Sequence, residues 1–202
     1  MKLYYAPGAC SMAVHCVLRE LGYRFDLERV DLREGRTAAG ADYSTVNPKG
    51  YVPALLLDDG QVLTEAAAIL QYLADLRPES GLVPPPGDLG HYRLLEWLTF
   101  ISSEIHKTLG ALFNPQLPPA CREVSLALFE RRCDWLAGAL GKGPFLMGER
   151  YTIADPYLFT VLSWSSVLSV DLGRWPALQG YLARVAARPA VQETLRAEGL
   201  IG

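Results

Sequence analysis

A cysteine near the start of the sequence stands where a loop is expected to become a helix. Cys10 directly follows Ala6-Pro7-Gly8-Ala9, and apolar residues recur at helical spacing as far as Leu21. The positive end of a helix dipole lowers the pKa of a thiol and favours the nucleophilic thiolate, and Ser11 adds a hydroxyl group beside it. We therefore expect thiol chemistry at Cys10. Its position alone fits a small buried residue that opens a helix as well.

A second segment carries main-chain groups suited to a peptide ligand. In Asn47-Pro48-Lys49-Gly50-Tyr51-Val52-Pro53-Ala54, a proline stands at the start of an apolar strand. A proline in this place is often cis, and cis geometry exposes the N–H and C=O groups of the preceding residue, Val52, to an extended peptide. A loop that simply ends at a strand fits the segment equally well.

A third segment, Thr64-Glu65-Ala66, ends a strand and opens a helix. The free amides of a helix N-terminus bind anions such as a carboxylate, and Glu65 can receive an ammonium group. A site that holds both groups suits an α-amino acid moiety. The alternative is a capping Thr64 followed by a Glu65 that matches the helix dipole.

Polar residues also follow one face of the first long helix of the second half. Thr99, Ser103, His106 and Lys107 recur at spacings of one helical turn, which places hydroxyl groups, an imidazole and an ammonium group on one side. This stripe indicates either the lining of a cleft or an ordinary solvated face. Neither His15 nor His91 has a comparable context.

Two differently patterned halves must position these residues. Up to about Leu76 the pattern predicts an α/β unit with a mixed sheet, in which Asp58-Asp59-Gly60 marks a hairpin and Gly22 ends the first helix. The expected elements are strands at Lys2–Tyr5, Phe25–Leu32, Val52–Leu57 and Gln61–Thr64 and helices at Cys10–Leu21 and Glu65–Leu76, with a loop at 31–47.

The Pro/Gly-rich segment 78–87 is typical of an interdomain linker, and everything after it is predicted to be helical. We therefore expect domains at 1–77 and 88–202. The second contains Thr152-Ile153-Ala154-Asp155, a capping box in which Thr152 accepts from the Asp155 amide and Asp155 accepts from the Thr152 amide. Its helices are expected at about Asp88–Phe113, Pro119–Leu140, Ala154–Val170, Pro176–Ala187 and Val191–Glu198.

Composition narrows the function classes. The 202 residues are 50% hydrophobic and carry a net charge of −3, which argues against disorder and against general nucleic-acid binding. We find no signal peptide and no membrane-spanning stretch. Four sparse cysteines without a C-x-x-C pair indicate reduced thiols in the cytoplasm, and no spacing resembles a metal-ligand set.

In their order and spacing these motifs resemble the glutathione S-transferases, in particular the bacterial beta class, over essentially the whole chain. The resemblance rests on Tyr4-Tyr5-Ala6-Pro7-Gly8-Ala9-Cys10-Ser11, Val46-Asn47-Pro48-Lys49-Gly50, Val52-Pro53-Ala54-Leu55, Leu63-Thr64-Glu65, Glu104-Ile105-His106-Lys107 and Tyr151-Thr152-Ile153-Ala154-Asp155. It implies a thioredoxin-like N-terminal domain that binds glutathione and an all-helical C-terminal domain that contributes the electrophile site, assembled as a homodimer.

The resemblance also implies roles for individual residues. Cys10, Ser11 and His106 would be catalytic, and the absence of a metal-ligand spacing predicts no metal. Glutathione, as co-substrate, would meet Cys10, Arg36, Tyr51, Val52, Pro53, Glu65, Ala66, Thr99, Ser103, His106 and Lys107. Three positions depart from the family pattern: Gly35, next to Arg36, replaces a frequent lysine, Tyr51 a frequent glutamine and Thr99 a frequent asparagine.

The function expected from this resemblance is conjugation of the glutathione thiol to hydrophobic electrophiles, with glutathione-dependent thiol–disulfide exchange through Cys10 as a second activity. The alternative is a ligand-binding or adaptor protein of the same fold, because a fold does not fix a function. A dithiol oxidoreductase is disfavoured because Cys10-Ser11-Met12-Ala13 lacks a resolving cysteine.

Overall fold

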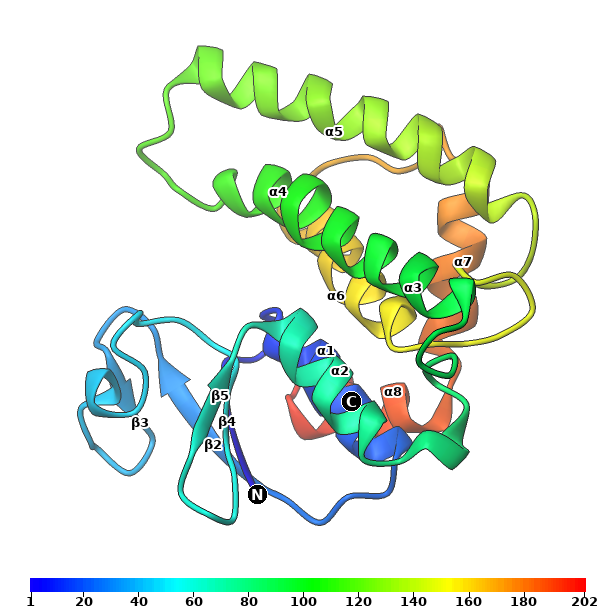
Figure 1. Ribbon diagram of the computed structural model, residues 1–202. Helices are drawn as coiled ribbons and strands as arrows, with labels where there is room; N and C mark the ends of the chain where they lie inside the picture. Colours follow the sequence, from blue (N-terminus) through cyan, green and yellow to red (C-terminus); the bar gives the residue numbers. More distant parts are fainter. The chain divides into compact units, whose positions relative to one another are not determined.

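The computed structural model describes residues 1–202, which form two compact units (Figure 1). The first unit combines Met1–Ser80 with Arg188–Gly202, and the second is Gly81–Ala187. A short 3-10 helix, η2 (Pro78–Ser80), lies where the linker is expected. Compared with the expected domains, the linker 78–87 is divided between the two units, and the last residues of the chain group with the first unit. The functions assigned to the two domains remain predictions.

The first unit is built on a five-stranded sheet with the order β3-β2-β1-β4-β5, in which β1 and β2 are parallel and the other neighbours antiparallel. The hairpin expected at Asp58-Asp59-Gly60 joins β4 to β5 and is confirmed. β3 was not expected, because two residues are too few to show a periodic pattern. The strands are β1 (Lys2–Tyr5), β2 (Asp26–Asp31), β3 (Arg36–Thr37), β4 (Ala54–Leu56) and β5 (Val62–Thr64).

Three helices of the first unit lie together on one side of these strands in Figure 1: α1 (Ser11–Glu20), α2 (Ala66–Asp75) and α8 (Pro189–Ala197). α1 contacts both α2 and α8 and is almost wholly buried, which agrees with its apolar stripe. Gly22 ends α1 as predicted: it has a φ of 65°, and the Tyr23 amide bonds back to the Leu18 carbonyl at 3.0 Å. The α/β organisation of the N-terminal half is therefore confirmed.

The second unit is helical. Its most buried element is α6, in which most residues are buried, the charged Asp155 among them. None of the helices combines the length and the apolar character needed to cross a membrane. The helices are α3 (Leu89–Phe100), η3 (Ile101–His106), α4 (Lys107–Ala111), α5 (Pro119–Leu140), α6 (Ala154–Val167) and α7 (Pro176–Ala186).

One expected helix is not regular. The segment Asp88–Phe113 was predicted as a single α-helix, but η3 in its middle is a π-helix. A π-helix widens the turn to i→i+5 hydrogen bonds and often occurs at functional sites. Ile101 and Ile105 on η3 are fully buried, so the apolar spacing that suggests a helix continues through the widened turn.

The expected capping box is present with altered bonding. The Thr152 amide donates to Asp155 Oδ2 at 2.7 Å, as predicted. The reciprocal bond is different, because the Asp155 amide donates to the Thr152 carbonyl and the Thr152 hydroxyl donates to Asp155 Oδ2 at 3.1 Å. Asp155 also accepts from the Leu146 amide and the Tyr181 hydroxyl. Despite these four donors, burial raises the pKa of Asp155 to about 6.

Candidate functional site

Cys10 caps the N-terminus of α1 and donates from Sγ to the Val52 carbonyl at 3.2 Å. Burial raises the pKa of its thiol to about 12, and the Cys10 and Ser11 amides at the helix start lower it by less. The charge of Glu65 raises this pKa further. The expected thiolate is therefore wrong at neutral pH, because the cost of burying a negative sulfur exceeds the effect of the helix dipole. Cys10 is a protonated hydrogen-bond donor.

Ser11 is fully buried and holds the loop that precedes α1. Its hydroxyl group accepts from the Ala6 amide at 3.2 Å and lies 3.3 Å from the Ala6 carbonyl, to which it donates. The Ala9 amide bonds to the same carbonyl at 3.0 Å. The Ser11 hydroxyl group is thus engaged in closing the loop Ala6–Cys10, so that it fixes the place of its neighbour Cys10.

The peptide bond between Val52 and Pro53 is cis, as expected. Val52 is buried, its carbonyl accepts from Cys10, and its amide donates to no acceptor in the structure. The preceding carbonyl, of Tyr51, accepts from Asn47 Nδ2 at 2.6 Å and from the Tyr43 hydroxyl at 3.0 Å. These two bonds hold the main chain before Val52 in place.

Asn47 and Tyr43 were not singled out from the sequence. Asn47 begins the segment Asn47-Pro48-Lys49-Gly50-Tyr51-Val52-Pro53-Ala54. Only the structure shows that its side chain is 1% exposed, and a polar side chain so buried is expected to have a hydrogen-bond partner. Tyr43 is the first residue of the 3-10 helix η1 (Tyr43–Thr45), in a region expected to be a loop.

Glu65 lies between β5 and α2 with a φ of 72° and a ψ of 117°, a conformation that costs a residue with a side chain ~1–3 kcal/mol. It gives no side-chain cap to α2. Its Oε1 instead accepts from Lys49 Nζ at 2.5 Å and from the Tyr51 hydroxyl at 2.6 Å. The bond to Glu65 raises the pKa of Lys49. Glu65 therefore receives an ammonium group in the structure, that of Lys49.

The start of α2 offers donors beside this cluster. The first intrahelical bond runs from the Ile69 amide to the Glu65 carbonyl, so the amides of residues 66–68 precede it. Ala66, the first of them, is buried. An anion binds well at such a helix start, and Lys49 adds a positive charge close to it.

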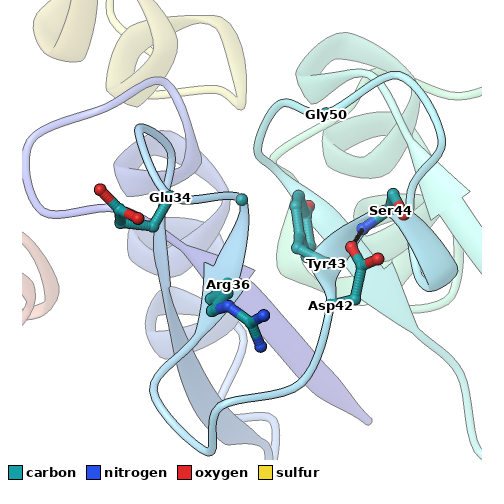
Figure 2. Close-up of a pocket in the computed structure, with 7 residues that line it drawn as sticks. Glu34, Arg36, Asp42, Tyr43, Ser44 and Gly50 are labelled. Carbon is teal, nitrogen blue, oxygen red and sulfur yellow. Dashed lines mark hydrogen bonds between the residues drawn. The ribbon is translucent and has the colours of Figure 1, made fainter.

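Arg36 lies on β3 and borders a small cavity of about 210 Å³ in the first unit. Figure 2 shows Arg36 and Asp42 on facing sides of this cavity, with Asp42 held by the Ser44 amide at 2.9 Å. Arg36 Nη1 donates to the Gly40 carbonyl at 2.9 Å. The guanidinium group thus braces its own loop. The remaining lining comes from Glu34, Gly35, Tyr43 and Gly50.

In the second unit His106 ends η3 and is half-buried among aromatic rings. Its Nδ1 lies 2.9 Å from the Tyr157 hydroxyl group, and its ring meets the Trp164 ring edge to face with centroids 4.9 Å apart. Phe113 packs on the same Trp164. Tyr157 and Trp164 were not selected from the sequence, where both read as ordinary core residues of an apolar helix.

The other members of the predicted polar stripe lie on one exposed face. Thr99, Ser103 and Lys107 are exposed, and the Ser103 hydroxyl group donates to the Thr99 carbonyl at 2.9 Å. The structure therefore places them together on the surface of the second unit. It contains no group of three or more His, Cys, Asp and Glu side chains positioned to hold a metal ion.

Comparison with known proteins adds to this geometry. Residues 8–76 match the family model described as "Glutathione S-transferase, N-terminal domain", and residues 119–184 match "Glutathione S-transferase, C-terminal domain". The chain is 46% identical to glutathione S-transferase GstA of Escherichia coli O157:H7 over 99% of its length and 100% of that protein.

Solved structures agree with these matches. A sphingomonad glutathione S-transferase complexed with glutathione is 43% identical, with a TM-score of 0.95 and full coverage of both chains. The bacterial beta class glutathione S-transferase of Sphingomonas chungbukensis is 41% identical, with a TM-score of 0.96 and the same coverage.

Proposed function

Because the chain belongs to the glutathione S-transferase family, we propose that it conjugates the thiol of glutathione to hydrophobic electrophiles. The observation that carries this proposal is the grouping of Cys10, the main chain of Val52 and the carboxylate of Glu65 in the first unit. GstA of Escherichia coli O157:H7 is a transferase by name, and the sphingomonad glutathione S-transferase was solved with glutathione.

The same grouping suggests how glutathione binds. Its cysteinyl main chain would pair with the amide and carbonyl of Val52, beside cis Pro53. Its γ-glutamyl end carries an ammonium group and a carboxylate, which suit Glu65 and the α2 amides that begin at Ala66. Tyr51 and Lys49 contact Glu65 and would adjust to the ligand.

The outer end of glutathione is a glycyl carboxylate. Arg36 is the cation we assign to it, since Gly35 offers no charge. Contacts from Thr99, Ser103 and Lys107 would come from a second subunit, as the beta-class resemblance implies. We propose a homodimer, which accords with the exposure of the large apolar side chains Leu89, Tyr92 and Trp135.

In the conjugation step the glutathione thiol loses its proton to solvent, a carbon–sulfur bond forms, and the leaving group departs with the bonding electrons. A protonated Cys10 would turn its S–H from the Val52 carbonyl toward the glutathione sulfur and stabilise the developing thiolate together with the α1 amides. We propose that His106, with its ring fixed by Tyr157, borders the electrophile.

The raised pKa of Cys10 favours conjugation over thiol–disulfide exchange. Exchange requires a Cys10 thiolate as the attacking group, and burial makes this species scarce at neutral pH. A mixed disulfide with glutathione would then form slowly. No observation in the structure favours the alternative, a non-enzymatic ligand-binding or adaptor protein of the same fold.

The test is conjugation of 1-chloro-2,4-dinitrobenzene, followed by absorbance and by mass spectrometry of the glutathionyl product. Wild type should form the conjugate and chloride in equal amounts. Glu65→Gln should raise KM for glutathione about tenfold or more, the factor for loss of a bond to a charged group. Glu96→Gln, an exposed residue of α3 paired with Arg93, is the matched control and should behave as wild type. Glutathione binding without turnover of any electrophile in a panel would refute the proposal.

A further inference from the structure

A buried acid near the end of the chain holds the loop that carries Cys10. Glu198 is the C-cap residue of α8, and its side chain is fully buried in the first unit. Its Oε2 accepts from the Gly8 amide at 2.8 Å. Gly8 lies in the loop Ala6–Cys10 and has a φ of 70°. Residues 190 positions apart in sequence therefore meet directly.

The end of α8 fixes Glu198 in this position. Gly199 has a φ of 70°, its amide bonds to the Arg196 carbonyl at 3.0 Å, and the Leu200 amide bonds to the Leu195 carbonyl at 2.9 Å. This is a Schellman motif, the hydrogen-bonded end that a left-handed glycine allows. It also places Leu200 beside Gly8, where a Cβ atom on Gly8 would lie 3.6 Å from Leu200 Cδ2.

A hydrogen-bonded chain compensates the buried charge. His15 is fully buried, its Nδ1 lies 2.9 Å from Glu198 Oε1, and its Nε2 lies 2.9 Å from Arg19 Nε. Because the Arg19 guanidinium is a permanent donor, His15 Nε2 must be the acceptor. His15 Nδ1 then carries the hydrogen and donates to Glu198. Arg19 continues to Glu193 at 3.2 Å on the exposed side of α8.

We propose that Glu198 is a positioning residue for the active-site thiol: through Gly8 it holds the loop Ala6–Cys10 so that Cys10 Sγ points at the Val52 carbonyl. His15 and Arg19 serve this contact by fixing the two carboxylate oxygens as acceptors. Both oxygens of Glu198 are engaged, one by the loop and one by α1. The carboxylate thus ties the loop to the helix that Cys10 begins. The inference rests on the proposed function for its importance to activity, but the contact itself is measurable without glutathione.

Glutamine cannot replace Glu198 in this arrangement. A carboxamide has one acceptor oxygen and one NH₂ group, whereas both positions around Glu198 are occupied by donors, Gly8 N–H and His15 Nδ1–H. His15 cannot move its hydrogen from Nδ1 to Nε2, because Nε2 accepts a hydrogen bond from Arg19 Nε. Glu198→Gln therefore places donor against donor on one side. Glu193→Gln is the matched control, since it removes an exposed carboxylate of the same helix and leaves Glu198 unchanged.

The experiment measures amide hydrogen exchange by NMR, with Gly8 as reporter and Val14 in α1 as reference, in the full-length protein without glutathione. Glu198→Gln should accelerate exchange at Gly8 about tenfold or more and leave Val14 near wild type. It should also raise the alkylation rate of Cys10 at neutral pH, because a released loop exposes the thiol. Glu193→Gln should change neither.

Three results would overturn the inference. Equal acceleration at Gly8 and Val14 means that Glu198 supports the unit as a whole. Release of Gly8 with unchanged Cys10 alkylation means that the loop does not position the thiol. Fast, unprotected exchange of the Gly8 amide in wild type would show that the hydrogen bond to Glu198 does not form in solution. This measurement does not depend on whether Glu198→Gln folds. Glu198→Asp, whose side chain is too short to reach both donors, is the second variant. Absence of transferase activity in the wild-type protein would refute only the proposed function.

Discussion

The pH dependence of Cys10 alkylation tests directly whether burial, which raises the pKa of the thiol, outweighs the helix start, which lowers it. Burial raises the pKa of Cys10 from 9.0 to about 12, so at any pH below 9 the thiolate fraction falls ~1000-fold relative to an ordinary thiol. A more basic thiolate is also more nucleophilic, with a Brønsted coefficient of about 0.4–0.5, so each Cys10 thiolate reacts ~20–30 times faster than an ordinary one. The net expectation is that Cys10 reacts with iodoacetamide ~30–50 times more slowly than N-acetylcysteine at neutral pH.

The assay follows the Cys10 peptide by mass spectrometry across the pH range in which the protein stays folded. The alkylation rate should rise about tenfold per pH unit without a plateau below pH 10, because the thiol is still mostly protonated there. Glu65→Gln removes a negative charge that raises the pKa, so the same curve should move to lower pH by less than ~1 unit, since burial is the larger cause.

A plateau at or below pH 8 for Cys10 would refute the reasoning. It would show that the α1 amides stabilise the thiolate more than burial destabilises it, and thiol–disulfide exchange would then become the favoured chemistry. Alkylation confined to Cys121, the exposed cysteine of α5, would leave the burial argument intact.

Three more outcomes are expected. Asp155 has a native pKa of about 6, against 3.8 for an ordinary carboxyl group, so the native state binds the proton of Asp155 more tightly than the unfolded state does. The free energy of unfolding should therefore fall by ~3 kcal/mol as the pH rises from about 4 to 6. Urea titrations at several pH values should show this decrease in wild type and not in Asp155→Asn. Thr152→Ala, which removes one donor to Asp155, should lower the free energy of unfolding by ~1 kcal/mol, and an unchanged thermal midpoint would contradict the cap. His106→Phe keeps the ring contact with Trp164 and loses the bond to Tyr157, so turnover of the electrophile should fall while KM for glutathione stays within about twofold; an equal change in both would contradict the assigned role.

Local signals in the sequence predict the regular elements well. α5 begins and ends at Pro119 and Leu140, as expected, because a proline at the first helical position and a glycine after the last are strong start and stop signals. The cis bond before Pro53 and the hairpin at Asp58-Asp59-Gly60 follow from equally local chemistry. The π-helix at Ile101–His106 does not, since the buried Ile101 and Ile105 would recur at the same spacing in an α-helix.

The roles assigned to the site residues stay predictions, and the electrostatics of the candidate site could not be predicted from the sequence. The helix start at Cys10 is visible in the sequence, but the burial that sets its pKa depends on chain segments far from it, including Val52. His15 had no local context, because its partner Glu198 lies 183 residues away. Glu65 was expected to receive the ammonium group of a ligand's α-amino acid moiety, and in the structure its carboxylate accepts from Lys49.

The grouping of Arg188–Gly202 with Met1–Ser80 has a consequence for synthesis of the protein. The ribosome makes the second unit before it makes α8, so α1 lacks its contacts with α8 while all of Gly81–Ala187 emerges. The thiol loop gains its anchor at Glu198 only when translation has passed α8. Released chains that end at Ala187 should therefore contain a folded second unit, while their first unit, which lacks α8, is still open to proteases and chaperones.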